Sequence, residues 1–558
     1  MNTGRTAGTC RGAPEWSASI VSGTGRLTWP VIAIVALLCM VAGSASYPFL
    51  APDEARHAGI VHDMWAARQY LVPRVNGFPT LDGAPLHYWV SLLFLALFGP
   101  YEWVLRLPSA LAAVALLLVV GKVFVTPADR RGATRLALLF LIQPALLIAG
   151  RFATPDMLSL LLLTVAVGGF LRVVQHREQG RESWSALCTA WGATGLLGLS
   201  AGMLAVMLPL LTIGLWLVFR RRIDLLISLR CGVGVLTLAI LVLPWLLWVE
   251  SRHPGIVPAM LHKQAMCLLG GARHGWVELG HGFCALLVFA GVLPLYATLA
   301  RLRRPALQAA LRTPLAGLMA VWLLVLAPLH VLMTMSPAGH VVALVVPLLY
   351  FGFLAMQPDT PASRWQRMRP WCAPVLLAAV LAAAGTQFLG PRVSGMRPLA
   401  QTLSQHYNPA TDKAIMLGRY DYDFNFHLRS PKLVYVATEW ENQEGLLPYW
   451  KQGFMESARF VPETAARMLL NAAADENAIL GHDAGEAGSD QGLNALFGRL
   501  CERRSVNLWV IGAADSASRY PILDSFPLRV DTPEVRVWYL SAGREPRLCV
   551  AWTLQRWP

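Results

Sequence analysis

Two short segments near the beginning of the chain concentrate residues that could carry out a group transfer. The first reads Pro52-Asp-Glu-Ala-Arg-His57, and the second reads Leu81-Asp-Gly-Ala-Pro-Leu-His-Tyr-Trp89. A positioned carboxylate can act as a general base toward a hydroxyl, and an arginine can bind a phosphate through two parallel hydrogen bonds. An ordinary polar loop would also contain a few carboxylates. Composition alone therefore does not distinguish a catalytic segment from an ordinary polar loop. The candidate residues in these segments are Asp53, Glu54, Arg56, His57, Asp82, His87 and Tyr88.

The position of the first segment favours a role at a membrane surface. Asp53 and Glu54 directly follow an apolar stretch, so the pair cannot lie far from the end of that stretch. Trp65 and Tyr70 follow at a spacing that suits an amphipathic helix on the membrane, with Met64 and Leu71 available to dip into it. We therefore expect the acidic pair to lie at the membrane–water boundary.

A third acidic candidate is Asp156, at the end of the segment Arg151-Phe-Ala-Thr-Pro-Asp156 between two apolar stretches. An ionisable residue at the end of a membrane helix is a site hypothesis by default. Helix capping is the alternative, because Thr154 or Asp156 could cap a helix that starts near Pro155. Both interpretations can hold together.

The elements that must position these residues are apolar stretches of about 20 residues, the length needed to cross hydrocarbon. The chain has 558 residues, of which 55% are hydrophobic and 14% charged, against about 25% charged in an ordinary soluble domain. We expect an all-α polytopic membrane protein with about 11 to 13 transmembrane helices. The stretches cover residues 30–50, 105–125, 135–150, 155–173, 185–200, 203–219, 231–249, 279–299, 314–333, 339–356 and 371–390.

The basic residues fall in alternate gaps between these stretches. Residues 1–390 carry a net charge of +15, whereas residues 391–558 carry −1. Nucleic-acid binding would require clustered Lys and Arg on a soluble surface, so this pattern indicates membrane topology and excludes a nucleic-acid partner. The positive-inside rule places the basic gaps in the cytoplasm. They contain Arg5, Arg11, Arg26, Lys122, Arg130, Arg131, Arg135, Arg172, Arg177, Arg181, Arg220, Arg221, Arg222, Arg301, Arg303, Arg304, Arg364, Arg367 and Arg369.

This topology divides the chain into three parts. Residues 1–28 form a cytoplasmic tail, residues 29–390 a transmembrane domain, and residues 391–558 a domain on the outer side. Within the transmembrane domain, residues 51–104 form the first outer loop and residues 251–278 a second, lid-like one. The apolar stretch Tyr88–Phe98 is too short to cross, so we interpret it as an interfacial or re-entrant helix.

The last 170 residues or so alternate short β-like runs with helical ones, which predicts a small α/β domain. It lacks a Gly-rich phosphate loop after a strand and a nucleophile elbow, so we expect it to be structural or to bind the acceptor. The predicted strands are Ala414–Gly418, Leu433–Val436, Leu508–Ile511 and Val535–Leu540, and the predicted helices are Pro462–Asn471 and Asp490–Leu500.

The two motifs together resemble a known family. Pro-Asp-Glu-Ala-Arg, followed about 27 residues later by Asp-x-x-Pro-Leu-His-Tyr-Trp and then by a lone Asp at the start of a later span, is similar to the bacterial branch of the protein O-mannosyltransferase superfamily. That branch includes the lipid A aminoarabinose transferases and has the GT-C fold. The resemblance continues through residues 74–79, Val242–Glu250 and Ser336–Tyr350, and it covers about residues 28–356.

The resemblance implies transfer of a sugar from a polyprenyl phosphate to an acceptor on the outer face. Asp53 matches the family's catalytic aspartate, Asp156 its second acidic position, and Arg56 the arginine near the donor phosphate. Asp82 stands where the family usually has Glu, so Asp53 and Asp82 could hold a divalent metal ion. If the acceptor is itself a phosphate, Asp53 would position it or bind the metal. Further residues expected to contact the acceptor or support the site are Glu54, His57, His87, Tyr88 and Lys263.

The chain departs from the family pattern where the family has phosphate-binding lysines. The usual Glu-Lys-Pro-Pro is Asp82-Gly83-Ala84-Pro85 here, and a later Thr-Lys-Gly is Ser200-Ala201-Gly202. A basic residue of the last matched segment is replaced by His340. The substitute donor-phosphate ligands that we consider are Arg74, Arg151, Lys263 and His340, each of which could equally be an ordinary interfacial residue.

The expected partners are a polyprenyl-phosphate-linked sugar, an acceptor and the lipid bilayer. Lipid A, another glycolipid, a polysaccharide and a protein all remain open as acceptors. The expected location is a bacterial inner membrane, with the N-terminus cytoplasmic and the C-terminal domain periplasmic. The missing lysines motivate an alternative, a non-catalytic relative that binds a lipid-linked sugar or partners an active transferase. A transporter is the weakest hypothesis, because the sequence has no duplicated half.

Overall fold

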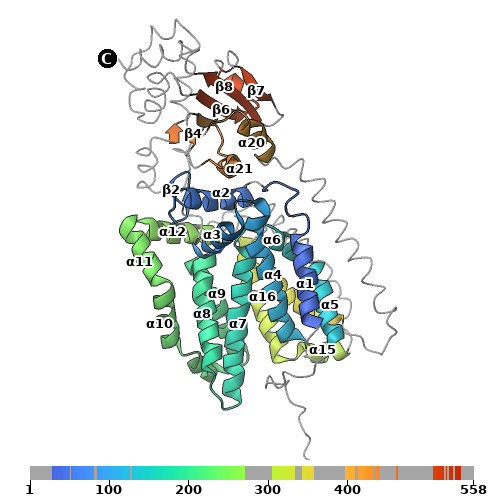
Figure 1. The fold of residues 1–558 in the computed structure, drawn as a ribbon. Helices are drawn as coiled ribbons and strands as arrows, with labels where there is room; N and C mark the ends of the chain where they lie inside the picture. The colour runs from blue at the N-terminus through green and yellow to red at the C-terminus, as the bar shows by residue number, and fades with distance from the viewer. Residues whose placement is uncertain are drawn as a thin grey trace, which may run out of the picture.

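The structure is a computed structural model with a large helical part and a smaller part built on a β-sheet (Figure 1). The helical part comprises most of the described residues up to Ala355, and the sheet is built from residues 413–541. The predicted helical part with apolar helices is confirmed, and the predicted small C-terminal α/β part is seen in part, as a sheet with short helices. The structure describes residues 28–50, 52–80, 84–125, 129–269, 305–332, 342–356, 396–408, 412–430, 434–438, 460–462, 507–520, 523, 527–531 and 535–541.

Long apolar helices form the centre of the helical part. In the described part of the chain, three helices are long and apolar enough to cross a membrane: α4 (Glu102–Phe124), α7 (Asp156–Glu178) and the segment Ile223–Leu241. A 23-residue helix extends about 35 Å, slightly more than the hydrocarbon thickness of about 30 Å. The pair α5 (Arg130–Leu141) and α6 (Pro144–Arg151) is apolar enough only when taken together and is bent by 72°, so it forms either a broken span or a re-entrant loop.

Shorter helices complete the bundle, and together with the long ones they enclose a large apolar core. This core draws on α1, α4 to α9, α16 and α18, so distant parts of the sequence pack against one another. The remaining helices of this part are α1 (Thr28–Val41), α8 (Trp184–Ala201), η1 (Met203–Val206), α9 (Met207–Phe219), η2 (Ile223–Leu229), α10 (Cys231–Leu241), α11 (Leu243–Arg252), α15 (Pro305–Leu311), α16 (Pro314–Leu332) and α18 (Val345–Ala355).

Most of the predicted stretches that the structure describes are helical, and the differences follow from local chemistry. Stretch 135–150 is interrupted before Pro144 and stretch 231–249 before Pro244, because proline removes a backbone donor and its ring clashes with the preceding turn. Stretch 30–50 is helical only to Val41, and stretch 339–356 is described only from residue 342. The predicted stretches 279–299 and 371–390 lie outside the described residues.

A layer of shorter elements lies between the long helices and the sheet (Figure 1). It contains α2 (Asp53–Ala66), α3 (Leu86–Phe98), α12 (Ile256–Leu269) and a hairpin of β1 (Arg74–Val75) and β2 (Phe78–Pro79). Asn76 and Gly77 both have positive φ, as the tight turns of two-residue hairpins require. The predicted helix Tyr88–Phe98 is present as α3, whose 13 residues extend only about 20 Å.

Helix α2 differs in one respect from the sequence expectation. Met64 is fully buried, in a cluster that includes Tyr88 of α3, Leu105 of α4 and Phe426 of the C-terminal part. Only the end of the segment carries exposed apolar groups, with Trp65 38% and Leu71 46% exposed. Helix α2 is therefore enclosed between the bundle and the C-terminal part, and Met64 does not dip into the membrane.

The C-terminal part contains a six-stranded sheet in the order β5-β4-β3-β6-β8-β7. Strands β5, β4, β3 and β6 are parallel, whereas β8 and β7 are antiparallel to their neighbours. The four predicted strands are present, whereas β5 and β7, with three and four residues, were not predicted. Both predicted helices of this part lie outside the described residues. The elements are α20 (Arg397–Ser404), β3 (Lys413–Leu417), α21 (Phe424–Leu428), β4 (Tyr435–Thr438), β5 (Phe460–Pro462), β6 (Asn507–Ala513), α26 (Ser516–Arg519), β7 (Leu528–Asp531) and β8 (Val535–Ser541).

The first loop and the C-terminal part, both expected on the outer side, contact each other directly. Asn76 Nδ2 donates to the carbonyl of Val434 at 2.7 Å, and Val434 N donates to Asn76 Oδ1 at 3.0 Å. A Cβ atom at Gly59 would lie 2.3 Å from the carbonyl oxygen of Tyr422, so only glycine permits this approach of α2. The two segments therefore share one end of the bundle.

Candidate functional site

Asp53 and Arg56 form an ion pair in the first turn of α2. Arg56 Nη2 donates to Asp53 Oδ1 at 3.0 Å, and the two side chains are 26% and 46% exposed. Asp53 and Glu54 occupy the helix N-terminus, where the positive end of the helix dipole stabilises carboxylates. The pair is therefore fixed at one end but open to a ligand, which suits a carboxylate and a guanidinium that act on a substrate.

The adjacent Glu54 points the other way, into the protein, and pairs with Arg106 of α4. Arg106 Nε donates to Glu54 Oε1 at 2.7 Å and Nη2 donates to Oε2 at 2.9 Å, while the two side chains are only 2% and 1% exposed. Such a bidentate pair combines strength with a fixed geometry. Glu54 therefore supports the site from inside, and its carboxylate does not face an acceptor.

Arg106 also organises the chain that leads from α1 into α2. It donates to the carbonyl oxygens of Ser44, Tyr47 and Pro48, and its guanidinium lies 3.9 Å from the centre of the Tyr47 ring. Sequence reasoning missed Arg106 because it lies inside an apolar stretch. The sequence did contain a signal for Arg106, because a charged residue within a membrane span is by default a candidate site residue.

Glu54 also joins the beginning of α2 to the beginning of α7. Its carboxylate accepts hydrogen bonds from Leu50 N at 2.9 Å and from Ala153 N at 3.0 Å. Ala153 belongs to the turn that leads into Asp156, the first residue of α7. Asp53 and Asp156, far apart in the sequence, are thus attached to the same buried carboxylate through their neighbours.

The first turn of α7 shows whether Thr154 or Asp156 caps this helix. Pro155 occupies the N-cap position without a side-chain hydrogen bond. Thr154 Oγ1 donates to Asp156 Oδ2 at 3.0 Å, so neither Thr154 nor Asp156 caps the helix in the usual way. Asp156 still benefits from the helix dipole, and its carboxylate remains a candidate for the site.

His57 of α2 and His87 and Tyr88 of α3 form a buried aromatic cluster. His57 Nδ1 and the Tyr88 hydroxyl are 2.9 Å apart, and the rings of His57 and His87 have centroids 5.7 Å apart. Burial lowers the pKa of His87 to about 4, although a hydrogen bond to the backbone of Ala153 favours the protonated form. His87 is therefore neutral at neutral pH and connects α3 to the turn before α7.

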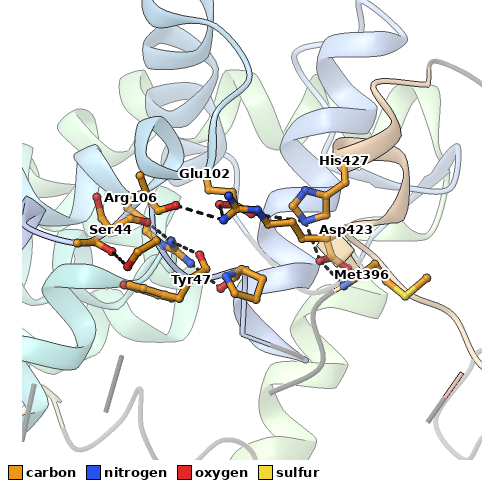
Figure 2. A network of polar contacts seen from close by, with 12 residues as sticks. Ser44, Tyr47, Glu102, Arg106, Met396, Asp423 and His427 are labelled. Atoms are coloured by element: carbon orange, nitrogen blue, oxygen red, sulfur yellow. Dashed lines mark hydrogen bonds and ion pairs between the residues drawn. The ribbon is translucent and has the colours of Figure 1, made fainter. Parts of the chain in front are cut away.

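The network continues from Arg106 toward the C-terminal part (Figure 2). Arg397 Nη1 donates to Glu102 Oε2 at 2.9 Å, and His427 Nε2 lies 3.2 Å from Asp423 Oδ2 and 3.8 Å from Glu102 Oε1. Figure 2 shows Glu102 between Arg106 on one side and His427 on the other. The C-terminal part is thus attached to the same end of α4 that positions Glu54.

The predicted phosphate ligands are placed very differently from one another. Arg151 donates to the carbonyl oxygens of Cys39 and Ala42, so it is engaged at the end of α1. Arg74 donates to Gly77 O at 3.1 Å, and burial lowers the pKa of its guanidinium. The pKa of His253 is lowered first by burial and then by the charge of Arg74, so Arg74 faces the second outer loop. His340 and Asp82 lie outside the described residues.

Lys263 is carried by α12, which packs against the segment where the family has a lysine. Gln264 Oε1 accepts from Leu204 N at 3.4 Å. A Cβ atom at Gly202, whose φ is +96°, would lie 2.2 Å from Gln264 Nε2. Lys263 therefore lies one residue from Gln264, which contacts Gly202 of the segment Ser200-Ala201-Gly202.

The expected metal site gains no second ligand from the described residues. Within these ranges, no group of three or more His, Cys, Asp and Glu side chains could hold a metal ion. Arg56 lies beside Asp53 and would repel a cation, and Asp82, the other expected ligand, is not described. No chemical step is therefore assigned to a metal.

The chain resembles proteins of known family. Residues 82–248 match the family model described as dolichyl-phosphate-mannose-protein mannosyltransferase. The undecaprenyl phosphate-alpha-4-amino-4-deoxy-L-arabinose arabinosyl transferase of Edwardsiella ictaluri is 28% identical over 40% of this chain and 41% of its own length. The protein with the same description from Shewanella sediminis is 28% identical over 36% of this chain and 37% of its own length. The chain thus spans about two fifths of the length of the curated relatives that it matches.

The fold is shared with a solved structure. The apo crystal structure of ArnT from Cupriavidus metallidurans superposes with a TM-score of 0.69 at 18% identity, covering 94% of this chain and 98% of that one. The structure of the same protein bound to undecaprenyl phosphate has a TM-score of 0.67 at 16% identity and covers 93% of this chain. Residues 82–248 are thus similar to the dolichyl-phosphate-mannose-protein mannosyltransferase family, and the chain shares its fold with ArnT from Cupriavidus metallidurans.

Proposed function

We propose that this protein is a membrane glycosyltransferase that moves a sugar from a polyprenyl phosphate to an acceptor. The observation that carries the proposal is the accessible pair of Asp53 and Arg56, held at one end of the bundle by the buried pair of Glu54 and Arg106. The relatives named above are described as acting on an undecaprenyl-phosphate-linked sugar, which supports a donor of this chemical class for the present chain.

The proposed reaction breaks the bond between the anomeric carbon and the phosphate oxygen. The electron pair goes to the phosphate, whose charge Arg56 stabilises through charge-assisted hydrogen bonds. The acceptor hydroxyl attacks the same carbon, and Asp53 takes the proton of that hydroxyl. Asp156 assists from the first turn of α7, and Lys263 or Arg74 contributes further positive charge near the donor.

The proposed orientation follows from the charges. The end of the bundle that carries Asp53 also carries the C-terminal part, while the arginine-rich turns lie at the other end of α7 and α8. By the positive-inside rule, the arginine-rich end is cytoplasmic. We place the protein in a bacterial inner membrane with about 11 to 13 spans, and the site and residues 391–558 in the periplasm.

The proposed acceptor is a surface lipid, with lipid A as the first candidate because the family that the sequence motifs resemble includes the lipid A aminoarabinose transferases. The decisive experiment is mass spectrometry of the lipids of cells that carry the wild-type gene, a deletion or Asp53→Asn. We expect one glycolipid to lose one sugar mass in both the deletion and the variant. Asp531→Asn is the matched control, because Asp531 forms a similarly exposed pair with Arg536 at 2.9 Å, and it should retain the product.

The alternative is a non-catalytic relative that binds a lipid-linked sugar or partners an active transferase. The observation in its favour is Ala201, which stands where the family has a phosphate-binding lysine. Purified protein that releases polyprenyl phosphate from the donor, with loss of the activity in Asp53→Asn, would exclude this alternative. A normally produced Asp53→Asn protein with undiminished product would overturn the assignment of Asp53.

A further inference from the structure

A pocket lies where the end of α7 turns into the beginning of α8, and the proposed transfer does not use it. This turn is at the end of the bundle farthest from the C-terminal sheet (Figure 1). The pocket has a volume of about 240 Å³ and is formed by the last turns of α7, the turn into α8 and the segment from η2 to Arg230. Because α7 has 23 residues, this pocket lies about 35 Å from Asp156. It is therefore separate from the candidate active site.

The charge around this pocket is strongly unbalanced. Between residues 172 and 230 the chain contains seven arginines and three carboxylates. Each of these carboxylates is already paired, Glu178 with Arg220 at 3.0 Å, Glu182 with Arg230 at 2.7 Å and Asp224 with Arg222 at 3.1 Å. Positive charge therefore remains after the internal pairs have formed.

The excess positive charge is carried by two of the arginines that line the pocket, Arg177 and Arg181. Arg177 is 54% exposed and its ion pair with Glu182 is long, at 3.7 Å. Arg181 forms no ion pair among the residues that the structure describes. Two guanidinium groups so close to one cavity repel each other unless an anion lies between them, and phosphate is the anion that guanidinium groups bind in a bidentate way.

The same pocket has apolar walls that a soluble anion would not need. Val173 and Leu187 line it, and Ile227 beside them is 83% exposed. Trp184, 53% exposed, stacks under the Arg230 guanidinium, whose carbon lies 4.3 Å from the ring centre. Tryptophan of this kind is typical of the boundary between headgroups and acyl chains.

We propose that this pocket binds the headgroup of an anionic phospholipid from the surrounding leaflet. The phosphate lies between Arg177 and Arg181, and the acyl chains run over Ile227 toward the exposed side of α10. Basic pockets between membrane helices on the cytoplasmic side suit such headgroups. The bound lipid neutralises the excess charge and joins the turn between α7 and α8 to η2.

The test uses the purified full chain in a zwitterionic detergent, titrated with phosphatidylglycerol. Native mass spectrometry counts bound lipid, and the thermal unfolding midpoint reports its effect. Each arginine contributes about 1 kcal/mol toward an anionic headgroup, so the double variant Arg177→Gln/Arg181→Gln should bind phosphatidylglycerol about thirtyfold more weakly. Arg221→Gln is the matched control: Arg221 lies in the same basic end but does not line the pocket, and the variant should bind like the wild type.

Two further measurements keep the proposal open to refutation. Ile227→Ser removes the exposed apolar wall without changing any charge, and it should also weaken binding of phosphatidylglycerol. Phosphatidylcholine and inorganic phosphate should produce neither adduct nor shift at matched concentration. Unchanged phosphatidylglycerol binding by the double variant, or equal stabilisation by inorganic phosphate, would refute an anionic lipid site. The readout requires no sugar donor, and Asp53→Asn should bind the lipid normally, so this proposal and the transfer activity can fail independently.

Discussion

The two ends of the helical bundle use charged residues in opposite ways. At the end with the C-terminal part, Glu54 and Arg106 are almost completely buried and hold backbone groups of several segments. At the other end, Arg230 and Glu182 remain 37% and 51% exposed. Buried pairs fix the geometry of a site because each partner depends on the other, whereas exposed pairs contribute little and leave charge for ligands.

The largest effect should come from breaking the buried pair. Arg106→Leu leaves the Glu54 carboxylate buried without its counterion, which should cost about 3–5 kcal/mol of unfolding free energy. Glu182→Gln at the other end should cost less than about 1 kcal/mol. Denaturant unfolding in mixed micelles measures both values. Equal costs at the two ends would show that burial does not distinguish them.

A double variant sharpens this prediction. Replacing both partners, in Glu54→Leu/Arg106→Leu, removes the uncompensated charge as well as the pair. We therefore expect a smaller loss of stability than in Arg106→Leu alone, but the same loss of sugar transfer, because the turn before Asp156 and the first turn of α2 lose their common anchor. A double variant with normal transfer would show that Glu54 does not position Asp53.

A smaller effect is expected at the contact between the first loop and the sheet. Asn76→Gly keeps the positive φ of the turn but removes both hydrogen bonds to Val434. Leaving these buried backbone groups unsatisfied should cost about 1–3 kcal/mol. Hydrogen exchange should detect faster exchange of the Val434 amide, while amides in α7 stay protected. Unchanged exchange at Val434 would mean that Asn76 does not hold the C-terminal part.

The smallest expected effect is a pH dependence of the stability of the fold. It originates in α2, at the end of the bundle that carries the candidate site. Burial raises the pKa of Asp63 to about 7, against the lowering effect of hydrogen bonds from the Asn76 and Gly77 backbone. The folded protein therefore binds a proton that the unfolded chain releases near pH 4, and this contribution to stability decreases as the pH rises from about 4 to about 7.

Asp63→Asn should remove this part of the slope. The unfolding midpoint, measured between pH 5 and pH 8, should then vary less in the variant than in the wild type. Asp515→Asn is a suitable control, because Asp515 is 57% exposed and pairs with Arg519 at the surface. A variant that retains the full slope would assign it to other groups.

The length and continuity of the apolar stretches were sufficient to predict the helices whose surroundings are uniformly apolar. The helices α4, α7 and α8 coincide closely with the predicted stretches, because uninterrupted apolar runs have one stable form in hydrocarbon. The breaks before Pro144 and Pro244 were local signals that the stretch boundaries overlooked. The burial of Met64 could not be predicted, because it depends on the C-terminal part, more than 300 residues later in the chain, covering α2.

Only some residues of the candidate site could be proposed from the sequence, because the others depend on contacts in the folded chain. The motif indicated Asp53, Arg56 and Asp156, but it gave no sign that Glu54 faces inward, since adjacent residues on a helix point in different directions. Arg106 was hidden in an apolar run, and its role depends on backbone carbonyls that have no sequence signature. Whether Lys263 replaces a missing lysine depends on the packing of α12 against Gly202, which only the structure reveals.

The buried pair also has a consequence for how the chain enters the membrane during synthesis. Glu54 precedes Arg106 by 52 residues, so the ribosome delivers the carboxylate before the arginine. An unaccompanied arginine in a membrane span is costly for the insertion machinery. When α4 enters the membrane, Glu54, the counterion of Arg106, has already been synthesised. The residues that shape the candidate site would thus also help α4 to insert.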